Sequence, residues 1–163
     1  MSTSTAPSEY RVEKRRADAT VTLSSGSSVR GCFFLASSST RHDGPERIAD
    51  LLNSEAGFFP FEIGGGNSVR TVLYHRSHVI CAAIAEDEAT LDPGYGVATR
   101  RVVSVLLTNG QRIVGAVRVY RPEGRDRLSD WARQRETFRY IETGDATIVV
   151  NLAHIVEVSE VQE

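Results

Sequence analysis

Three features are scarce in this chain: cysteine, long apolar runs and catalytic motifs. Only two cysteines, Cys32 and Cys81, occur in 163 residues, and both fall in strand-like runs. That position favours buried, reduced thiols over a disulfide framework. The longest apolar run, from Val79 to Ala85, is far shorter than the roughly 20 residues that span a bilayer and fits a buried strand. We therefore expect a protein without a membrane-spanning segment.

No run of residues carries recognisable catalytic chemistry. The segment Gly64-Gly65-Gly66-Asn67 lacks the Gly-Lys-Ser/Thr ending of a phosphate-binding loop and predicts a hairpin turn instead. His42 lies beside an aspartate in a serine-rich loop, without further metal ligands at a suitable spacing. The first residues are Ser, Thr and Pro without the apolar core of a secretion signal, so we expect a cytoplasmic protein. We predict no enzyme activity, no cofactor and no metal.

Lysine is almost absent as well, because Lys14 is the only one and every other basic side chain is arginine. Arginine binds carboxylates and phosphates bidentately, so this bias is compatible with a recognition surface. A G+C-rich genome produces the same bias, and we favour that explanation. The formal net charge of −2 argues against indiscriminate binding to phosphate backbones.

The most informative feature that is present is an internal duplication. Four blocks recur in the same order: Leu23 to Gly31 as Leu107 to Gly115, Glu46 to Asp50 as Asp126 to Asp130, Phe58 to Phe61 as Phe138 to Ile141, and Ser77 to Ile80 as Ala153 to Val156. The separation shrinks along the chain, because Gly26 and Gly110 are 84 positions apart whereas His78 and His154 are 76 apart. Small loop insertions in the first copy explain this drift, since loops tolerate length changes and strands do not.

The duplication and the local patterns predict four segments. Residues 1–18 form a flexible tail, 19–84 the first copy, 85–99 an acidic, mobile linker and 100–163 the second copy. Each copy reads as five short strands with a helix between the second and the third. The strands are expected at 20–23, 29–35, 58–63, 69–74 and 78–84, then at 102–107, 111–120, 138–142, 146–150 and 154–158, with helices at 46–53 and 127–135. Gly31 and Gly115 are expected to bend the second strand of each copy.

These residues resemble the Sm-like (Lsm) small barrel. The resemblance rests on Gly26-Ser-Ser-Val29-Arg-Gly31 with His75-Arg-Ser-His78-Val79-Ile80, and on Gly110-Gln-Arg-Ile113-Val-Gly115 with Asn151-Leu-Ala-His154-Ile155-Val156. The chain also resembles an uncharacterised bacterial family with an Arg-Leu-x-Asp-x-Leu-Asn-like helix between strands two and three. The resemblance implies a mainly β protein of two tandem Sm-like or SH3-like five-stranded small barrels. It also implies assembly through strand four of one barrel and strand five of the next.

The uridine pocket that RNA-binding Sm proteins share does not carry over. The Asp and Asn expected after the bent strand are missing, and the Arg-Gly pair of the strand-four turn is replaced by His75-Arg76-Ser77 and Asn151-Leu152-Ala153. Arg76 is a partial substitute in the first copy only. Residues that we single out for contact with RNA or with a partner are His75, Arg76, Arg70, Asn151 and Arg112.

His78 and His154 occupy equivalent turns, and two interpretations of these histidines remain open. They are either repeated ligands or residues that cap a turn, and we favour the cap. For the whole chain we favour a non-enzymatic binding or scaffold protein that forms homo-oligomers and contacts an unidentified protein partner. The alternative is an RNA-binding or RNA-metabolism accessory protein.

Overall fold

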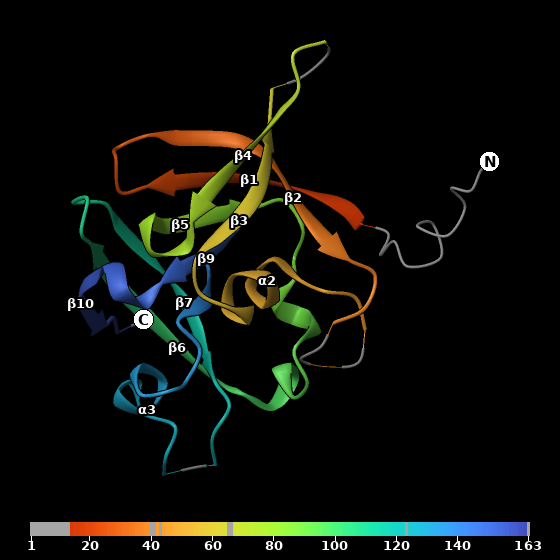
Figure 1. The fold of residues 1–163 in the computed structure, drawn as a ribbon. Coiled ribbons are helices and arrows are strands. Elements are labelled where there is room, and N and C mark those ends of the chain that lie inside the picture. The colour runs from red at the N-terminus through yellow and green to blue at the C-terminus, as the bar shows by residue number, and fades with distance from the viewer. Residues whose placement is uncertain (1–13, 40–41, 43, 65–66, 123, 163) are drawn as a thin grey trace.

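The protein is mainly β, as the sequence predicts. The structure is a computed structural model that describes residues 14–39, 42, 44–64, 67–122 and 124–162. Within these ranges ten antiparallel strands and two α-helices are found (Figure 1). The elements are β1 (Lys14–Leu23), β2 (Ser28–Ala36), α2 (Ile48–Ser54), β3 (Phe58–Ile63), β4 (Arg70–His75), η1 (Arg76–His78), β5 (Val79–Ile84), η2 (Ala89–Leu91), η3 (Tyr95–Val97), β6 (Thr99–Leu107), β7 (Arg112–Val119), α3 (Leu128–Ala132), β8 (Phe138–Glu142), β9 (Thr147–Asn151), η4 (Leu152–His154) and β10 (Ile155–Glu160).

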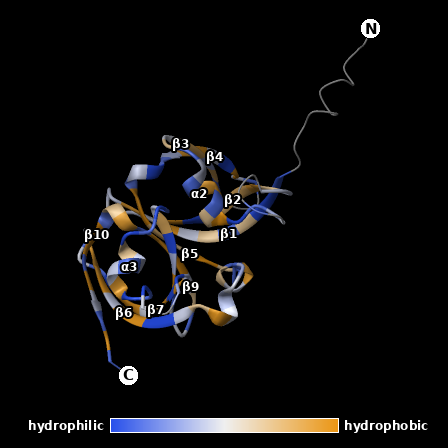
Figure 2. Ribbon diagram, turned by 90° about the horizontal axis from the view of Figure 1, so that it is seen from below, coloured by the Kyte–Doolittle hydropathy of each residue, from blue (hydrophilic) through white to orange (hydrophobic). Residues whose placement is uncertain are grey.

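All ten strands belong to one sheet, in the order β10-β6-β7-β8-β9-β5-β1-β2-β3-β4. The first half of the chain supplies β5-β1-β2-β3-β4 and the second half supplies β10-β6-β7-β8-β9. The halves meet where β9 pairs with β5, which we call the internal joint. The sheet is open, because β4 and β10 are its two ends; they lie apart in both views (Figures 1 and 2).

The second half repeats the first down to the register of its strand pairs. Phe58 lies opposite His75 in the β3·β4 pair, and Phe138 lies opposite Asn151 in the β8·β9 pair. The β1·β5 and β6·β10 pairs share a register shift at the same place. This agreement fixes which residues are equivalent: β4 corresponds to β9, and β5 corresponds to β10.

The two equivalent histidines hold turns. His78 Nδ1 lies 2.7 Å from Ser24 Oγ, and His154 Nδ1 lies 2.8 Å from Thr108 Oγ1. In both halves the histidine carbonyl also accepts a backbone hydrogen bond, from Ser24 N and Thr108 N respectively. Each histidine therefore ties the β-hairpin turn of its half to the 3₁₀ turn, which agrees with the capping interpretation.

Gly31 and Gly115 are needed because two backbones approach closely at each position. A Cβ atom on Gly31 would lie 2.1 Å from the carbonyl oxygen of Glu62, and one on Gly115 would lie 2.6 Å from that of Glu142. Real Cβ atoms do not approach backbone that closely, so only glycine fits without a shift of the strands. The glycines thus allow the backbones of β2 and β7 to approach the ends of β3 and β8 closely.

Both helices begin in the same way. Asp50 accepts a hydrogen bond from Arg47 N at 2.8 Å, and Asp130 accepts one from Arg127 N at 2.9 Å. Each carboxylate thereby satisfies a backbone donor that the first turn leaves without a partner. This cap explains why the aspartate recurs in the sequence at the same place in both helices.

Two hydrophobic clusters form the core, and each contains residues from the other half of the chain. The first consists mainly of residues of the first half but includes Phe138 and Val149. The second consists mainly of residues of the second half but includes Ile80 and Cys81. The hydropathy colouring shows apolar segments along both sides of the joint (Figure 2). The halves therefore share buried surface at the internal joint.

Two segments differ from the sequence prediction. β1 begins at Lys14, inside the predicted tail, because Ala17 and Ala19 continue the buried alternation of Val21; residues 1–13 lie outside the described residues. The predicted acidic linker is packed, since it contains η2 and η3 and its Glu88 is only 1% exposed. Alanine gives a weak apolar signal, and a buried glutamate gives none.

Candidate functional site

The internal joint is held by side chains as well as by the β5·β9 ladder. Asn151 Nδ2 donates to the carbonyl of Val79 at 2.9 Å, and its Oδ1 accepts from Ala153 N at the same distance. His154 Nε2 lies 2.7 Å from the carbonyl oxygen of Ser77, across the joint. Asn151 is the last residue of β9 and His154 ends the 3₁₀ turn η4 that follows, so this end of β9 helps to fix the position of one half against the other.

Asn53, on α2, forms a second clamp across the joint. Its Nδ2 donates to the carbonyl of Phe138 at 2.9 Å, and its Oδ1 accepts from Phe138 N at 2.9 Å. One amide side chain thus supplies a hydrogen-bond partner for both the N–H and the carbonyl of a β8 residue. This contact attaches the helix of the first half to a strand of the second.

Glu88 joins three parts of the molecule from a buried position. Its carboxylate accepts from Ile48 N at 2.8 Å and from the Tyr140 hydroxyl at 3.0 Å. Burial raises the pKa of the Glu88 carboxyl, although these hydrogen bonds favour its charged form. Burial also raises the pKa of the Tyr140 hydroxyl, with the Glu88 charge acting in the same direction. The segment between the halves is therefore a structural part of the joint.

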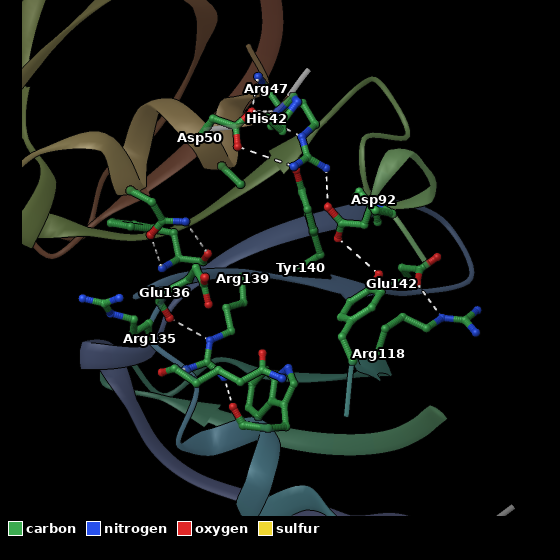
Figure 3. A pocket seen from close by; sticks show the side chains of 18 of the residues that line it. His42, Arg47, Asp50, Asp92, Arg118, Arg135, Glu136, Arg139, Tyr140 and Glu142 are labelled. Atoms are coloured by element: carbon green, nitrogen blue, oxygen red, sulfur yellow. Dashed lines mark hydrogen bonds and ion pairs between the residues drawn. The ribbon is translucent and has the colours of Figure 1, made fainter. Parts of the chain in front are cut away.

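A cleft of 590 Å³, the first cleft, lies beside the joint (Figure 3). On one side Arg47 pairs with Asp92 and, at 3.3 Å, with Asp50, whose carboxylate also lies 2.6 Å from His42 Nε2. Burial opposes ionisation of Asp50, but the hydrogen bonds from His42 and Arg47 outweigh it and lower the pKa of its carboxyl. Arg47 also lies over the ring of Tyr140.

The opposite side of the first cleft comes from the second half of the chain. Arg118 pairs with Glu142 at 3.3 Å and lies 4.3 Å from the centre of the Tyr95 ring. Arg139 donates to the carbonyls of Glu136 at 2.7 Å and of Gln134 at 2.6 Å, and also to that of Trp131. Figure 3 shows Arg135 and Arg118 at opposite ends of the cleft, with Arg139 between them and below Asp92.

A second cleft, of 780 Å³, brings together three of the residues that the sequence singled out: His75, Arg76 and Asn151. Arg76 is only 4% exposed, and its guanidinium donates to the carbonyls of Leu51 and Phe58. Burial lowers the pKa of the Arg76 guanidinium below its ordinary value. The guanidinium thus holds α2 against β3 and has few donors left for a ligand.

The other two predicted contact residues lie elsewhere. Arg70 is exposed at the start of β4. Arg112 is exposed at the start of β7, where it donates to Ser104 Oγ at 2.9 Å and lies 3.5 Å from Glu157. The five predicted residues therefore do not form one site.

The two ends of the sheet carry exposed apolar side chains. On the β4 side Phe58 is 61% exposed and Leu73 is 64% exposed, and on β10 Val156 is 62% exposed. Among the described residues β4 pairs only with β3, and β10 pairs only with β6. Unpaired strand edges of this kind are templates for further strand pairing.

Sequence reasoning missed most of the residues that build the joint and the first cleft. Asn53, Glu88 and Asp92 lie in helix and loop segments, and no spacing rule connects them with β8. Arg139 follows the buried Phe138 in β8, where the alternation of a strand predicts an exposed side chain, but Arg139 is buried as well. The one available signal was the position of Asn53 in the Arg47-to-Asn53 helix motif, which the repeat itself does not preserve because position 133 is arginine.

The chain matches no protein family, no curated protein and no solved structure in comparisons of sequence and fold. No group of three or more His, Cys, Asp or Glu within the described residues is placed to hold a metal ion. None of the helices in the same part of the chain is long and apolar enough to cross a membrane.

Proposed function

We propose that this protein is a non-enzymatic scaffold that assembles head to tail, with β10 of one copy pairing with β4 of the next. In this proposal each half is an Sm-like small-barrel unit, and the internal joint is the template for the contact between copies. The support comes from the equivalence of the halves: β9 pairs with β5, and their counterparts β4 and β10 are the unpaired ends.

The exposed residues on β3 and β4 are those that the internal joint buries in the other half. Phe58 is 61% exposed, whereas its counterpart Phe138 is 4% exposed. Leu73 is 64% exposed, whereas its counterpart Val149 is fully buried. Apolar side chains at positions that are buried wherever the partner strand is present indicate a surface made to be covered. This contrast is the observation that carries the proposal.

The other end of the sheet shows the same contrast. Val156 on β10 is 62% exposed, and its counterpart Ile80 on β5 is 1% exposed. The charged side chains of the two edge strands differ as well, because β4 begins with Arg70 while β10 contains Glu157 and Glu160, which pair with Arg112 and Arg101 of the same chain.

The internal joint also gives the register of the proposed contact. Ala82 lies opposite Val149 in the β5·β9 pair, so Val158 is expected opposite Leu73 of the next copy. His75 takes the place of Asn151, whose amide donates to a carbonyl across the joint. Because His75 Nδ1 accepts a hydrogen bond from Ser77 N, the Nε2 of His75 is left as the donor of the ring. Such a heterologous contact builds a ring if the rotation closes and a filament if it does not.

Absolute mass measured by light scattering over a range of protein concentrations tests the proposal. We expect a multiple of the 17.9 kDa chain mass for the wild type and the chain mass itself for Leu73→Asp. Leu91→Asp is the matched control, because Leu91 is 63% exposed but lies in η2, away from both edges. A wild-type mass of one chain at every concentration contradicts the proposal.

Absorbance at 260 and 280 nm across the same peak separates a protein scaffold from an RNA-binding protein. We expect the absorbance ratio of protein alone. Excess absorbance at 260 nm that nuclease removes would favour the RNA alternative. The burial of Arg76 supports the first outcome, since this side chain was the main candidate for holding a base.

A further inference from the structure

The first cleft has more positive charge than its carboxylates balance. Six arginines and four carboxylates line it, in a chain whose net charge is −2. Arg47 and Arg118 are paired with three of these carboxylates, Asp50, Asp92 and Glu142. The fourth carboxylate, Glu136, is the only one left against the remaining arginines that line the cleft, which are Arg121, Arg133, Arg135 and Arg139. The surplus lies on the side formed by the segments that precede and follow α3.

Three of these four arginines are exposed and have no ion pair within the described part of the chain: Arg121, Arg133 and Arg135. The fourth, Arg139, is 7% exposed and has no carboxylate within ion-pair distance among the same residues. Burial lowers the pKa of the Arg139 guanidinium to about 10. Its three hydrogen bonds to backbone carbonyls use only part of its five donors.

We propose that the first cleft binds a small organic phosphate, with the phosphate against the arginines that follow α3. Arginine forks bind phosphate oxygens bidentately, and a buried guanidinium without a counterion gains most from such a partner. The cleft volume of 590 Å³ lies in the range of small-molecule sites. The inference does not depend on self-association of the chain.

The opposite end of the cleft fits the uncharged part of such a ligand. Each carboxylate oxygen of Asp92 and Glu142 already accepts one hydrogen bond within the chain and has a lone pair left for a sugar or base hydroxyl or amino group. The Tyr120 ring, 37% exposed, offers a surface for stacking. The same carboxylates repel a second phosphate group. A ligand with its charge at one end therefore fits better than a nucleic-acid strand, which carries a phosphate at every nucleotide.

Trp131 provides a direct readout, because it is the only tryptophan of the chain and lines this cleft. Titration with ribose 5-phosphate and with adenosine monophosphate is expected to give a saturable change in its fluorescence, while ribose gives none. Calorimetry of the same titrations makes the result independent of the response of the tryptophan. No saturable binding of either phosphate by either method overturns the proposal.

The variant Arg133→Ala/Arg135→Ala tests the location of the site. Both side chains are exposed, so the fold is expected to persist, and affinity for the two phosphates is expected to fall by about tenfold or more. Arg30→Ala is the matched control, because Arg30 is an exposed arginine on β2 outside the cleft. Equal affinity in both variants contradicts the proposal. Binding of a single-stranded oligonucleotide without binding of ribose 5-phosphate contradicts it as well.

Discussion

The internal joint and the two open edges of the sheet are formed by equivalent strands: β9 and β5 are paired at the joint, and their counterparts β4 and β10 are the ends of the sheet. At the joint, β9 and β5 bury Val149 and Ile80 almost completely. At the ends of the sheet, their counterparts Leu73 and Val156 are more than half exposed. Since the strand registers of the halves agree, the difference arises from the missing partner and not from a different fold. The comparison teaches that the chain contains one completed contact of this kind and, at the two ends of the sheet, the equivalent strands without a second partner strand among the described residues.

The largest expected effect comes from a charge placed in the completed contact. Val149→Asp places a carboxylate opposite Ala82 within the first hydrophobic cluster, and we expect a loss of about 4 kcal/mol in the free energy of unfolding. Leu73→Asp makes the same change at the equivalent open position, where solvent reaches the carboxylate, and we expect a loss within about 0.5 kcal/mol in the monomer. Urea unfolding followed by circular dichroism measures both. Equal losses of stability for the two variants would contradict the contrast between a buried position 149 and an exposed position 73.

A smaller effect is expected at the helix clamp. Asn53→Ala leaves the N–H and the carbonyl of Phe138 without their side-chain partner, and we expect a loss of about 2 kcal/mol. Arg133, directly after α3, holds the equivalent position in the second half, and Arg133→Ala is expected to change the stability by less than about 0.5 kcal/mol. Urea unfolding of both variants checks the contrast. A similar loss of stability for both variants would contradict this contrast, because it would mean that Arg133 stabilises the monomer as much as Asn53 does.

The smallest expected effect concerns pH. The pKa of Glu88 is raised above its ordinary value of 4.5 in the folded chain, so the folded state binds a proton more tightly than the unfolded state. This carboxyl therefore contributes stability that increases as pH falls from neutral towards 4.5 and is lost again as pH rises through the raised pKa. Glu88→Gln removes this contribution and keeps an acceptor for Ile48 N and Tyr140.

The measurement is the difference in unfolding free energy between wild type and Glu88→Gln at pH 5 and at pH 7.5. The wild type is expected to gain on the variant at the lower pH. The lowered pKa of Asp50 acts with the opposite sign, but it is common to both proteins and cancels in the difference. A wild type that loses on the variant as the pH falls would contradict the role given to Glu88.

Much of the strand pattern could be predicted from the sequence, because alternating apolar residues and turn glycines are local signals. The turn histidines could be predicted for the same reason, since His78 and His154 recur with their neighbours. The start of β1 was missed because its buried positions before Val21 are alanines, which carry little apolar signal.

The internal joint and the first cleft could not be located in this way. Resemblance implied that strand four of one unit pairs with strand five of the next, but no local signal showed that β9 and β5 of one chain do so. The role of Glu88 depends on Tyr140, which is 52 positions away in the sequence. Asn53 binds the backbone of Phe138, 85 positions away, and Arg139 binds carbonyls of the irregular segment before β8. The burial of Arg76 was missed because sequence does not distinguish an arginine that binds carbonyls from one that meets a ligand.

The most direct test of the repeated contact is a disulfide placed in its expected register. Leu73→Cys/Val158→Cys puts the two thiols opposite each other across neighbouring copies, as Val149 and Ala82 are at the joint. Opposed residues of antiparallel strands have Cα atoms about 4.5–5.5 Å apart, which a disulfide spans. Mild oxidation is expected to give a ladder of linked chains under non-reducing conditions. Leu73→Cys/Ser159→Cys, with the second thiol on the opposite face, is expected to give much less; no ladder from the first pair, or equal ladders from both, would contradict the account.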